Sequence, residues 1–194
     1  MKDSSRALLL VSLAIGLTIG AATPARAQTF ISPLIGYTFG GDSGCPSLSG
    51  CQEKKLAGSV SIGTMGSVFG IEQEVAYTPN FFGDAPGLSS SVLTLMSHVM
   101  LVPKVGPVRP YVLAGIGLVK THIDLTTASV LTTDNNHLGW DIGGGLMGFF
   151  GAHVGVRGDL RYVCSFKDLT VLGFTLPDSK LNYARASAGV VLTF

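Results

Sequence analysis

The chain has 194 residues, of which 46% are hydrophobic and only 13% are charged, with 13 Lys and Arg against 12 Asp and Glu. This length suits one domain and is short for two. The balanced charge excludes the basic excess on which nucleic-acid binding depends. The mean hydropathy of +0.46 is high for a soluble domain with so few charges.

The first 27 residues have the organisation of a secretory signal peptide. Lys2 and Arg6 flank the start of the apolar run "ALLLVSLAIGLTIGAA", and the triplet "ARA" at residues 25–27 fits a signal-peptidase site. This pattern predicts cleavage before Gln28, which leaves residues 28–194 as one exported domain. The alternative is an uncleaved membrane anchor, for which the apolar run is short.

The rest of the chain is predicted as eight β-strands. No stretch of ten or more residues has the helical period, and clusters of Gly, Pro, Asn, Asp and Ser recur between the apolar segments. No apolar run after the signal peptide reaches the length of about 18 residues that a transmembrane helix needs. In chain order, the strands are predicted at residues 29–41, 55–63, 68–78, 91–102, 109–121, 137–150, 152–163 and 181–194.

The connections between these segments are predicted to alternate in length. Long connections follow the first, third, fifth and seventh segments, at residues 42–54, 79–90, 122–136 and 164–180, and the others are short. Transmembrane barrels of the outer membrane have this arrangement, with short periplasmic turns and longer extracellular loops. An even number of strands also puts both chain ends on the side of the short turns.

Apolar and polar side chains alternate along the strands. In the stretch "GVRGDLRYV", Val156, Leu160 and Tyr162 share one face and oppose a row of charges. If this charged face lies inside a barrel, charges of both signs can pair across the interior, and pairing makes their burial tolerable. The predicted interior network consists of Glu72, Glu74, Arg157, Asp159, Arg161 and Arg185.

Parity alone does not decide whether the apolar face lies inside or outside. The polar faces here are rich in Gly, Ala, Ser and single balanced charges, which suits the narrow interior of an eight-stranded barrel. A solvated outer face would carry more Lys, Asn and Gln. We therefore expect an all-β, eight-stranded antiparallel transmembrane up-and-down barrel. The tripeptide Arg157-Gly158-Asp159 would then be a coincidence, because its charges point inward.

Three cysteines stand in an exported chain, which is an oxidising context. Cys45 and Cys51 lie in the first long connection, and a local disulfide between them is the preferred interpretation. Cys164 is then left over, either as a free thiol or as an alternative partner of a loop cysteine. No His lies at ligand spacing near the pair, so no metal site and no cofactor are predicted.

Enzymatic chemistry has one candidate in the sequence. Ser97 and His98 are neighbours in "MSHV", but neighbours on a strand point to opposite faces and cannot form a nucleophile–base pair. His98 shares the parity of the interior. The glycine runs "GIG" and "GGG" lie within strands, where they indicate close packing or strong bending. No catalytic residue is predicted.

The order of these segments resembles a known family. The pieces "GIEQEVAYTPNFF", "RPYVLAGIGL", "GWDIGGGLMGFFGAHVGVRGDLRYV" and "ARASAGVVLTF" are similar to the small eight-stranded outer-membrane barrels of Gram-negative bacteria, the porin family related to the transmembrane domain of outer membrane protein A. The resemblance covers residues 28–194. It implies that the terminal Phe194 is part of the signal read by the barrel-assembly machinery.

The resemblance implies an outer-membrane location, with outer-membrane lipid, lipopolysaccharide, periplasmic chaperones and the assembly machinery as partners. We expect a monomer with a structural or surface-interaction role and a lumen plugged by paired charges, and no binding to nucleic acid. Two alternatives stay open at this point. One is a narrow, low-conductance channel, and the other is an enzyme that modifies outer-membrane lipid.

Overall fold

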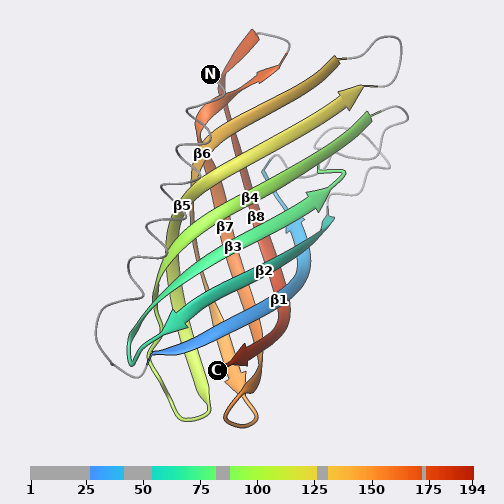
Figure 1. Cartoon of the computed structure of the whole chain (residues 1–194). Helices are drawn as coiled ribbons and strands as arrows, with labels where there is room; N and C mark the ends of the chain where they lie inside the picture. Colours follow the sequence, from blue (N-terminus) through green and yellow to red (C-terminus); the bar gives the residue numbers. More distant parts are fainter. Residues whose placement is uncertain (1–26, 42–53, 82–87, 126–130, 172–173) are drawn as a thin grey trace.

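Eight antiparallel strands make up most of the described chain and close into a barrel (Figure 1). A computed structural model describes residues 27–41, 54–81, 88–125, 131–171 and 174–194. Residues 1–26 of the predicted signal peptide and the candidate disulfide Cys45–Cys51 lie outside these ranges. The strands are β1 Gln28–Phe39, β2 Lys55–Met65, β3 Phe69–Pro79, β4 Leu88–Leu101, β5 Val108–Leu125, β6 Leu131–Phe149, β7 Val154–Val171 and β8 Phe174–Thr193.

Each strand pairs with the next one in the chain, and the last strand returns to the first. The closing β1–β8 ladder runs from Phe30 opposite Thr193 to Phe39 opposite Ala184. Closure leaves no sheet edge, so every strand has a partner on both sides. This confirms the predicted eight-stranded, antiparallel up-and-down barrel.

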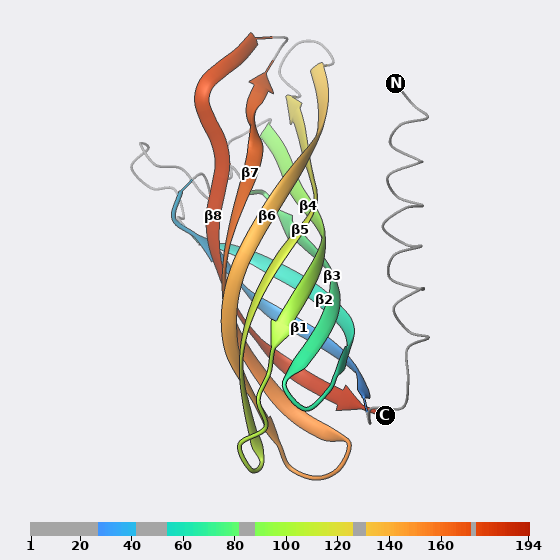
Figure 2. The same ribbon diagram turned by 90° about the vertical axis from the view of Figure 1, so that its left-hand side faces the viewer.

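The two ends of the barrel differ. The C-terminus lies at the end that carries the β2–β3, β4–β5 and β6–β7 turns (Figures 1 and 2). The β4–β5 turn uses Gly106 at a φ of 62°, a left-handed conformation that glycine adopts without strain. In an outer-membrane barrel the short turns are periplasmic, so we call this end periplasmic and the opposite end extracellular.

The predicted long connections after β5 and β7 are wrong. Strand pairing continues to Leu125 opposite Leu131 between β5 and β6, and β7 and β8 pair to Val171 opposite Phe174, with irregular register near Asp168. Figure 2 shows β6, β7 and β8 reaching beyond β1–β3 at the extracellular end. The polar segments at this end have the composition of loops. Backbone hydrogen bonds between two strands do not require an apolar face, however, and the threonines of these segments favour strands.

The burial pattern is inverted relative to a water-soluble barrel. Arg157 and Arg161 are each only 1% exposed, whereas Phe69 is 67% exposed and Ile116 is 62% exposed. A soluble protein would not leave such residues facing water while it buries guanidinium groups. The outer wall therefore suits lipid, as expected of a transmembrane barrel.

The interior is built in three layers along the barrel axis. On the inward row of β4, Met96, His98 and Met100 follow one another, and each belongs to a different layer. The periplasmic apolar layer consists of Phe30, Met65, Met100, Val102, Tyr111, Leu113, Met147 and Val191. The extracellular apolar layer consists of Phe81, Val92, Met96, Val119, Val163, Leu181 and Tyr183. Between them lies the charged layer, made of Glu72, Glu74, His98, Asp141, Arg157, Asp159, Arg161 and Arg185.

Candidate functional site

The charged layer is the candidate functional site. Its residues come from the middle of β3, β4, β6, β7 and β8, where the two-residue period points alternate side chains inward. Each of its eight side chains belongs to a buried residue. All six residues of the predicted interior network lie in this layer.

Three charged residues of β7 lie at the centre of the charged layer. Arg157, Asp159 and Arg161 are two residues apart and point to one face, as their spacing requires. Asp159 Oδ2 accepts hydrogen bonds from Arg157 Nη2 at 3.2 Å and from Arg161 Nη2 at 2.8 Å. The Arg157-Gly158-Asp159 tripeptide thus has both its charges inside the barrel, where they are inaccessible to a receptor.

The β7 arginines bridge the lumen to β3, which lies four strands away around the barrel. Glu72 accepts a hydrogen bond from Arg157 Nη1 at 2.6 Å and another from Arg161 Nη2 at 2.8 Å. Arg161 Nη1 also lies 2.8 Å from Glu74 Oε2. These short contacts between opposite charges offset the desolvation of each partner and join opposite walls of the barrel.

Glu74 connects two further strands to the network. Its carboxylate pairs with Arg185 on β8, and its Oε2 accepts a hydrogen bond from Ser61 on β2 at 3.4 Å. Because Arg161 contacts the same carboxylate, Glu74 is shared between two guanidinium groups. The network therefore reaches from β2 to β8.

His98 and Asp141 complete the charged layer, and the predicted network did not include them. His98 Nε2 lies 2.8 Å from Asp141 Oδ2, and His98 Nδ1 lies 3.6 Å from Glu72 Oε1. Sequence parity placed His98 inside. The same signal could have found Asp141, because it alternates with Trp140 and Ile142 in "GWDIG".

Tyr111 joins the charged layer to the periplasmic apolar layer. Its hydroxyl accepts a hydrogen bond from Arg157 Nε at 2.8 Å and donates one to Asp159 Oδ2 at 3.2 Å. The Arg157 guanidinium lies over the Tyr111 ring, 4.8 Å from its centroid, which is a cation–π contact. An aromatic ring with one polar group can serve both layers.

Inward-facing glycines make room for these large side chains. A Cβ at Gly115 would overlap the imidazole of His98, and one at Gly143 would lie 2.8 Å from Arg161 Cγ. A Cβ at Gly145 would lie 2.6 Å from the Tyr111 hydroxyl. This confirms the interpretation that the glycine runs serve close packing.

The side chains of the candidate Ser–His pair point to opposite faces of β4, as expected. Ser97 donates a hydrogen bond to Gln73 Oε1 at 2.7 Å on the outer wall, whereas His98 contacts Asp141 inside. Within the described ranges, no three His, Cys, Asp or Glu side chains are grouped to hold a metal ion. No helix among the same residues is long and apolar enough to cross a membrane.

Two further residues singled out in the sequence are Cys164, which lies within β7, and Phe194, which follows β8. Cys164 is a free cysteine on the outer wall, and its Sγ lies 3.6 Å from the carbonyl oxygen of Ser165. Phe194 is 75% exposed at the periplasmic end, and its backbone N–H donates to the carbonyl of Thr29. The side chain thus stays available, while the backbone continues the β1–β8 ladder.

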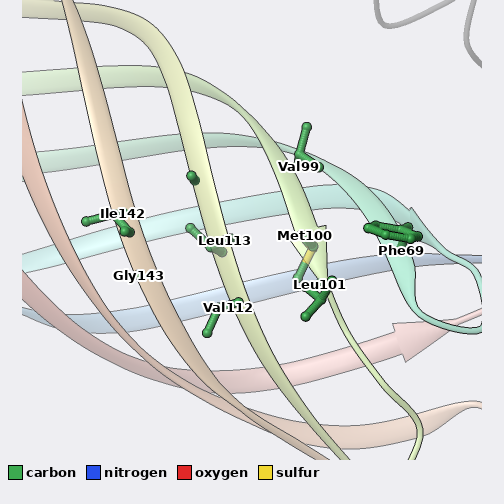
Figure 3. A pocket seen from close by; sticks show the side chains of 9 residues that line it. Phe69, Val99, Met100, Leu101, Val112, Leu113, Ile142 and Gly143 are labelled. Carbon is green, nitrogen blue, oxygen red and sulfur yellow. The ribbon is translucent and has the colours of Figure 1, made fainter.

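The outer wall carries a shallow apolar depression of about 340 Å³. Figure 3 shows Val99, Val112 and Ile142 around it, and Ala114 and Gly143 line the same site. The small side chain of Ala114 leaves room between its bulkier neighbours. The depression faces the lipid side of the wall and is separate from the charged layer.

Comparison with known proteins agrees with this architecture. Neisserial surface protein A is 16% identical, with 87% of this chain and 97% of that chain covered and a TM-score of 0.60. Ail, the attachment invasion locus protein of Yersinia pestis, is 12% identical over 87% and 97% of the two chains, with a TM-score of 0.55. OprG from Pseudomonas aeruginosa is 13% identical over 87% and 96%, with a TM-score of 0.51. At these identities the likeness is one of fold.

The sequence itself matches a family. No curated protein matches the chain, but the family model described as outer membrane protein beta-barrel domain matches residues 11–194. The match extends over all eight strands, and it supports a location in the outer membrane of a Gram-negative bacterium. The chain therefore belongs to the family of outer membrane protein β-barrel domains.

Proposed function

We propose that this protein is a closed, non-conducting barrel that anchors strand hairpins at the cell surface, without enzymatic activity. The observation that carries the proposal is the layered interior. A layer of paired charges lies between two layers of buried apolar side chains. An eight-stranded barrel is just wide enough for its side chains to fill.

The arrangement of the charges favours a plugged lumen and argues against a narrow channel. A selective pore presents rings of charge to a water-filled path. Here Glu72 bonds Arg157 and Arg161, and Glu74 pairs with Arg161 and Arg185. These charges satisfy one another across the lumen instead of facing water. The apolar layers on both sides add two barriers to hydrated ions.

The length of the strands supports a role at the surface. A tilted strand crosses the membrane with about 9–11 residues. β5 to β8 have 18, 19, 18 and 20 residues. The excess lies at the extracellular end (Figure 2). We propose that the β5–β6 and β7–β8 hairpins project from the membrane as paired strands and make the surface contacts of the protein.

Assembly belongs to the same proposal. Exposed apolar residues at the end of β8, including Leu192 and Phe194, would be read by the barrel-assembly machinery after delivery by periplasmic chaperones. The folded barrel would then stand as a monomer in outer-membrane lipid and lipopolysaccharide. The described outer wall is almost wholly apolar between the two ends, as this surrounding requires.

The plugged lumen predicts a negative result in planar bilayers. The purified barrel is expected to give no steady unit conductance at physiological salt, because ions meet two apolar layers and a set of ion pairs. A sixteen-stranded porin, whose lumen is an aqueous channel, serves as the positive control in the same bilayers. Reproducible unit steps from the barrel would contradict the plugged reading and favour a narrow channel.

The projecting hairpins predict where the chain can be labelled. An epitope inserted at residues 172–173, between β7 and β8, is expected to bind antibody on intact cells. The matched insertion in the β6–β7 turn at residues 150–153 is expected to bind only after the outer membrane is permeabilised. Equal labelling of both variants on intact cells, or labelling of the turn alone, would overturn the proposed orientation.

A further inference from the structure

We propose that the periplasmic mouth of the barrel is a binding site for a small molecule or peptide end that carries a carboxylate or phosphate group. The site is a cavity of about 520 Å³, and Arg109 and Lys104 are its two basic lining residues. Cavities of this size hold small ligands. The charged layer lies deeper in the barrel and is not part of this cavity, so the inference does not rest on the proposed function.

Arg109 is a buried cation that has no carboxylate partner among the residues that the structure describes. Its side chain points inward from the start of β5, and the residue is 9% exposed. Nη2 donates to Gln28 Oε1 at 3.2 Å, Nη1 lies 3.9 Å from Met65 Sδ, and the guanidinium lies 5.4 Å from the Phe149 ring centroid. All three partners are neutral.

The contrast with the charged layer shows what is missing. Arg157, Arg161 and Arg185 each have at least one carboxylate within ion-pair distance. In the part of the chain that the structure describes, neither Arg109 nor Lys104 has one. An unpaired buried charge is costly, so an external anion would find two unneutralised cations in one cavity.

The geometry indicates from which side the anion comes. Lys104 lies on the exposed β4–β5 turn, and the cavity also borders the β6–β7 turn at Gly151 and Ala152. The Arg109–Gln28 hydrogen bond crosses the mouth from β5 to β1. Because Arg109 points to the inside of the wall, a phosphate of the surrounding lipid would lie on the wrong side of the strand. The ligand therefore comes from the aqueous periplasm.

The floor of the cavity favours binding over passage. Met65 contacts Arg109 from the periplasmic apolar layer, and Phe30 and Met147 of that layer are fully buried. A charged group that reached Arg109 would meet apolar side chains beyond it. The cavity is thus a dead end, with Phe149 as an apolar wall and with Arg109, Lys104 and the amide of Gln28 as its polar side chains. Cleavage before Gln28, which the sequence predicts, would add an α-ammonium group beside it.

Binding is tested on the mature barrel in octyl glucoside micelles with Bis-Tris chloride buffer, because this detergent and this buffer carry no phosphate, carboxylate or sulfonate. The probes are inorganic phosphate, N-acetyl-dialanine with a free carboxylate, and the same peptide as its amide. The NMR signal of the Arg109 Nε–H group is expected to shift saturably with phosphate, with the free peptide or with both, but not with the amide. Which of the first two saturates identifies phosphate or carboxylate as the recognised group.

Three variants connect binding to the site. R109Q is expected to abolish binding, as followed by calorimetry, and K104Q to weaken it about tenfold, the range of a charge-assisted hydrogen bond. K54Q removes an exposed lysine at the extracellular end and is expected to change nothing. Because Lys104 is exposed, K104Q tests the site even if R109Q does not fold. Non-saturating shifts with every probe, or equal affinity in K104Q and the parent protein, would overturn the proposal.

Discussion

Replacing Arg161 with methionine is expected to lower the free energy of unfolding of the barrel by about 3–5 kcal/mol, the usual cost of removing one partner from a buried ion pair. Arg161 contacts Glu72, Glu74 and Asp159. Without the guanidinium, three buried carboxylates lose a counterion together. Methionine keeps the volume of the aliphatic part, so the charge is the main change.

The measurement is urea unfolding in micelles, followed by Trp140 fluorescence and by heat-modifiable migration on a detergent gel. L160M is the matched control, because Leu160 is the neighbouring residue and faces lipid, at 55% exposure. R161K, which keeps the charge but loses the planar fork, is expected to lie between the two. A loss below about 1 kcal/mol in R161M would mean that the cross-lumen bonds contribute little.

Gly145→Val is expected to destabilise the barrel by about 3 kcal/mol or to prevent its assembly, at the upper end of overpacking effects. A Cβ at this position would overlap the carbonyl oxygen of Gly158 on β7 and would lie 2.6 Å from the Tyr111 hydroxyl. The added side chain would have the backbone of β7 on one side and the charged layer on the other, so it could not move to relieve the overlap.

The control for this substitution is Gly58→Val on β2. A Cβ at Gly58 would meet no atom within 4 Å, and the position lies on the outer wall with Leu56 and Val60. This variant is expected to keep or raise stability, because glycine weakens a strand interior. If both valine variants unfold at the same urea concentration, the close approach of neighbouring atoms is not the reason for a glycine at position 145.

Much of the barrel wall could be predicted from the sequence. The two-residue alternation in β3, β7 and β8 placed Glu72, Arg157 and Arg185 on the inward rows, and the structure has them there. The ends of β5–β8 could not be predicted, because the run "LTTDNNH" lacks an apolar alternation and the run "KDLTVLG" has only a short one, at Leu169 and Val171. Their pairing comes from backbone hydrogen bonds between strands, which leave no side-chain period.

The apolar layers inside the barrel were also missed. Met65, Met100 and Met147 all point inward, although apolar residues were expected to face lipid. On β4 both faces carry apolar residues, so the inward row is marked in the sequence only by the polar Thr94 and His98. Methionine is a flexible side chain that fills irregular interiors. The number of methionines in so small a barrel could therefore have indicated apolar packing inside it.

By itself, the sequence determined which side chains share a face, because strand geometry sends alternate residues to opposite sides of the sheet whatever the sheet packs against. It also indicated that the charged row lies inside. Only the closed barrel decided which charges meet. Glu72 and Arg161 are 89 residues apart in the chain, yet their side chains hydrogen-bond at 2.8 Å. That distance depends on barrel closure, strand tilt and register together, and none of these is a local property of the chain.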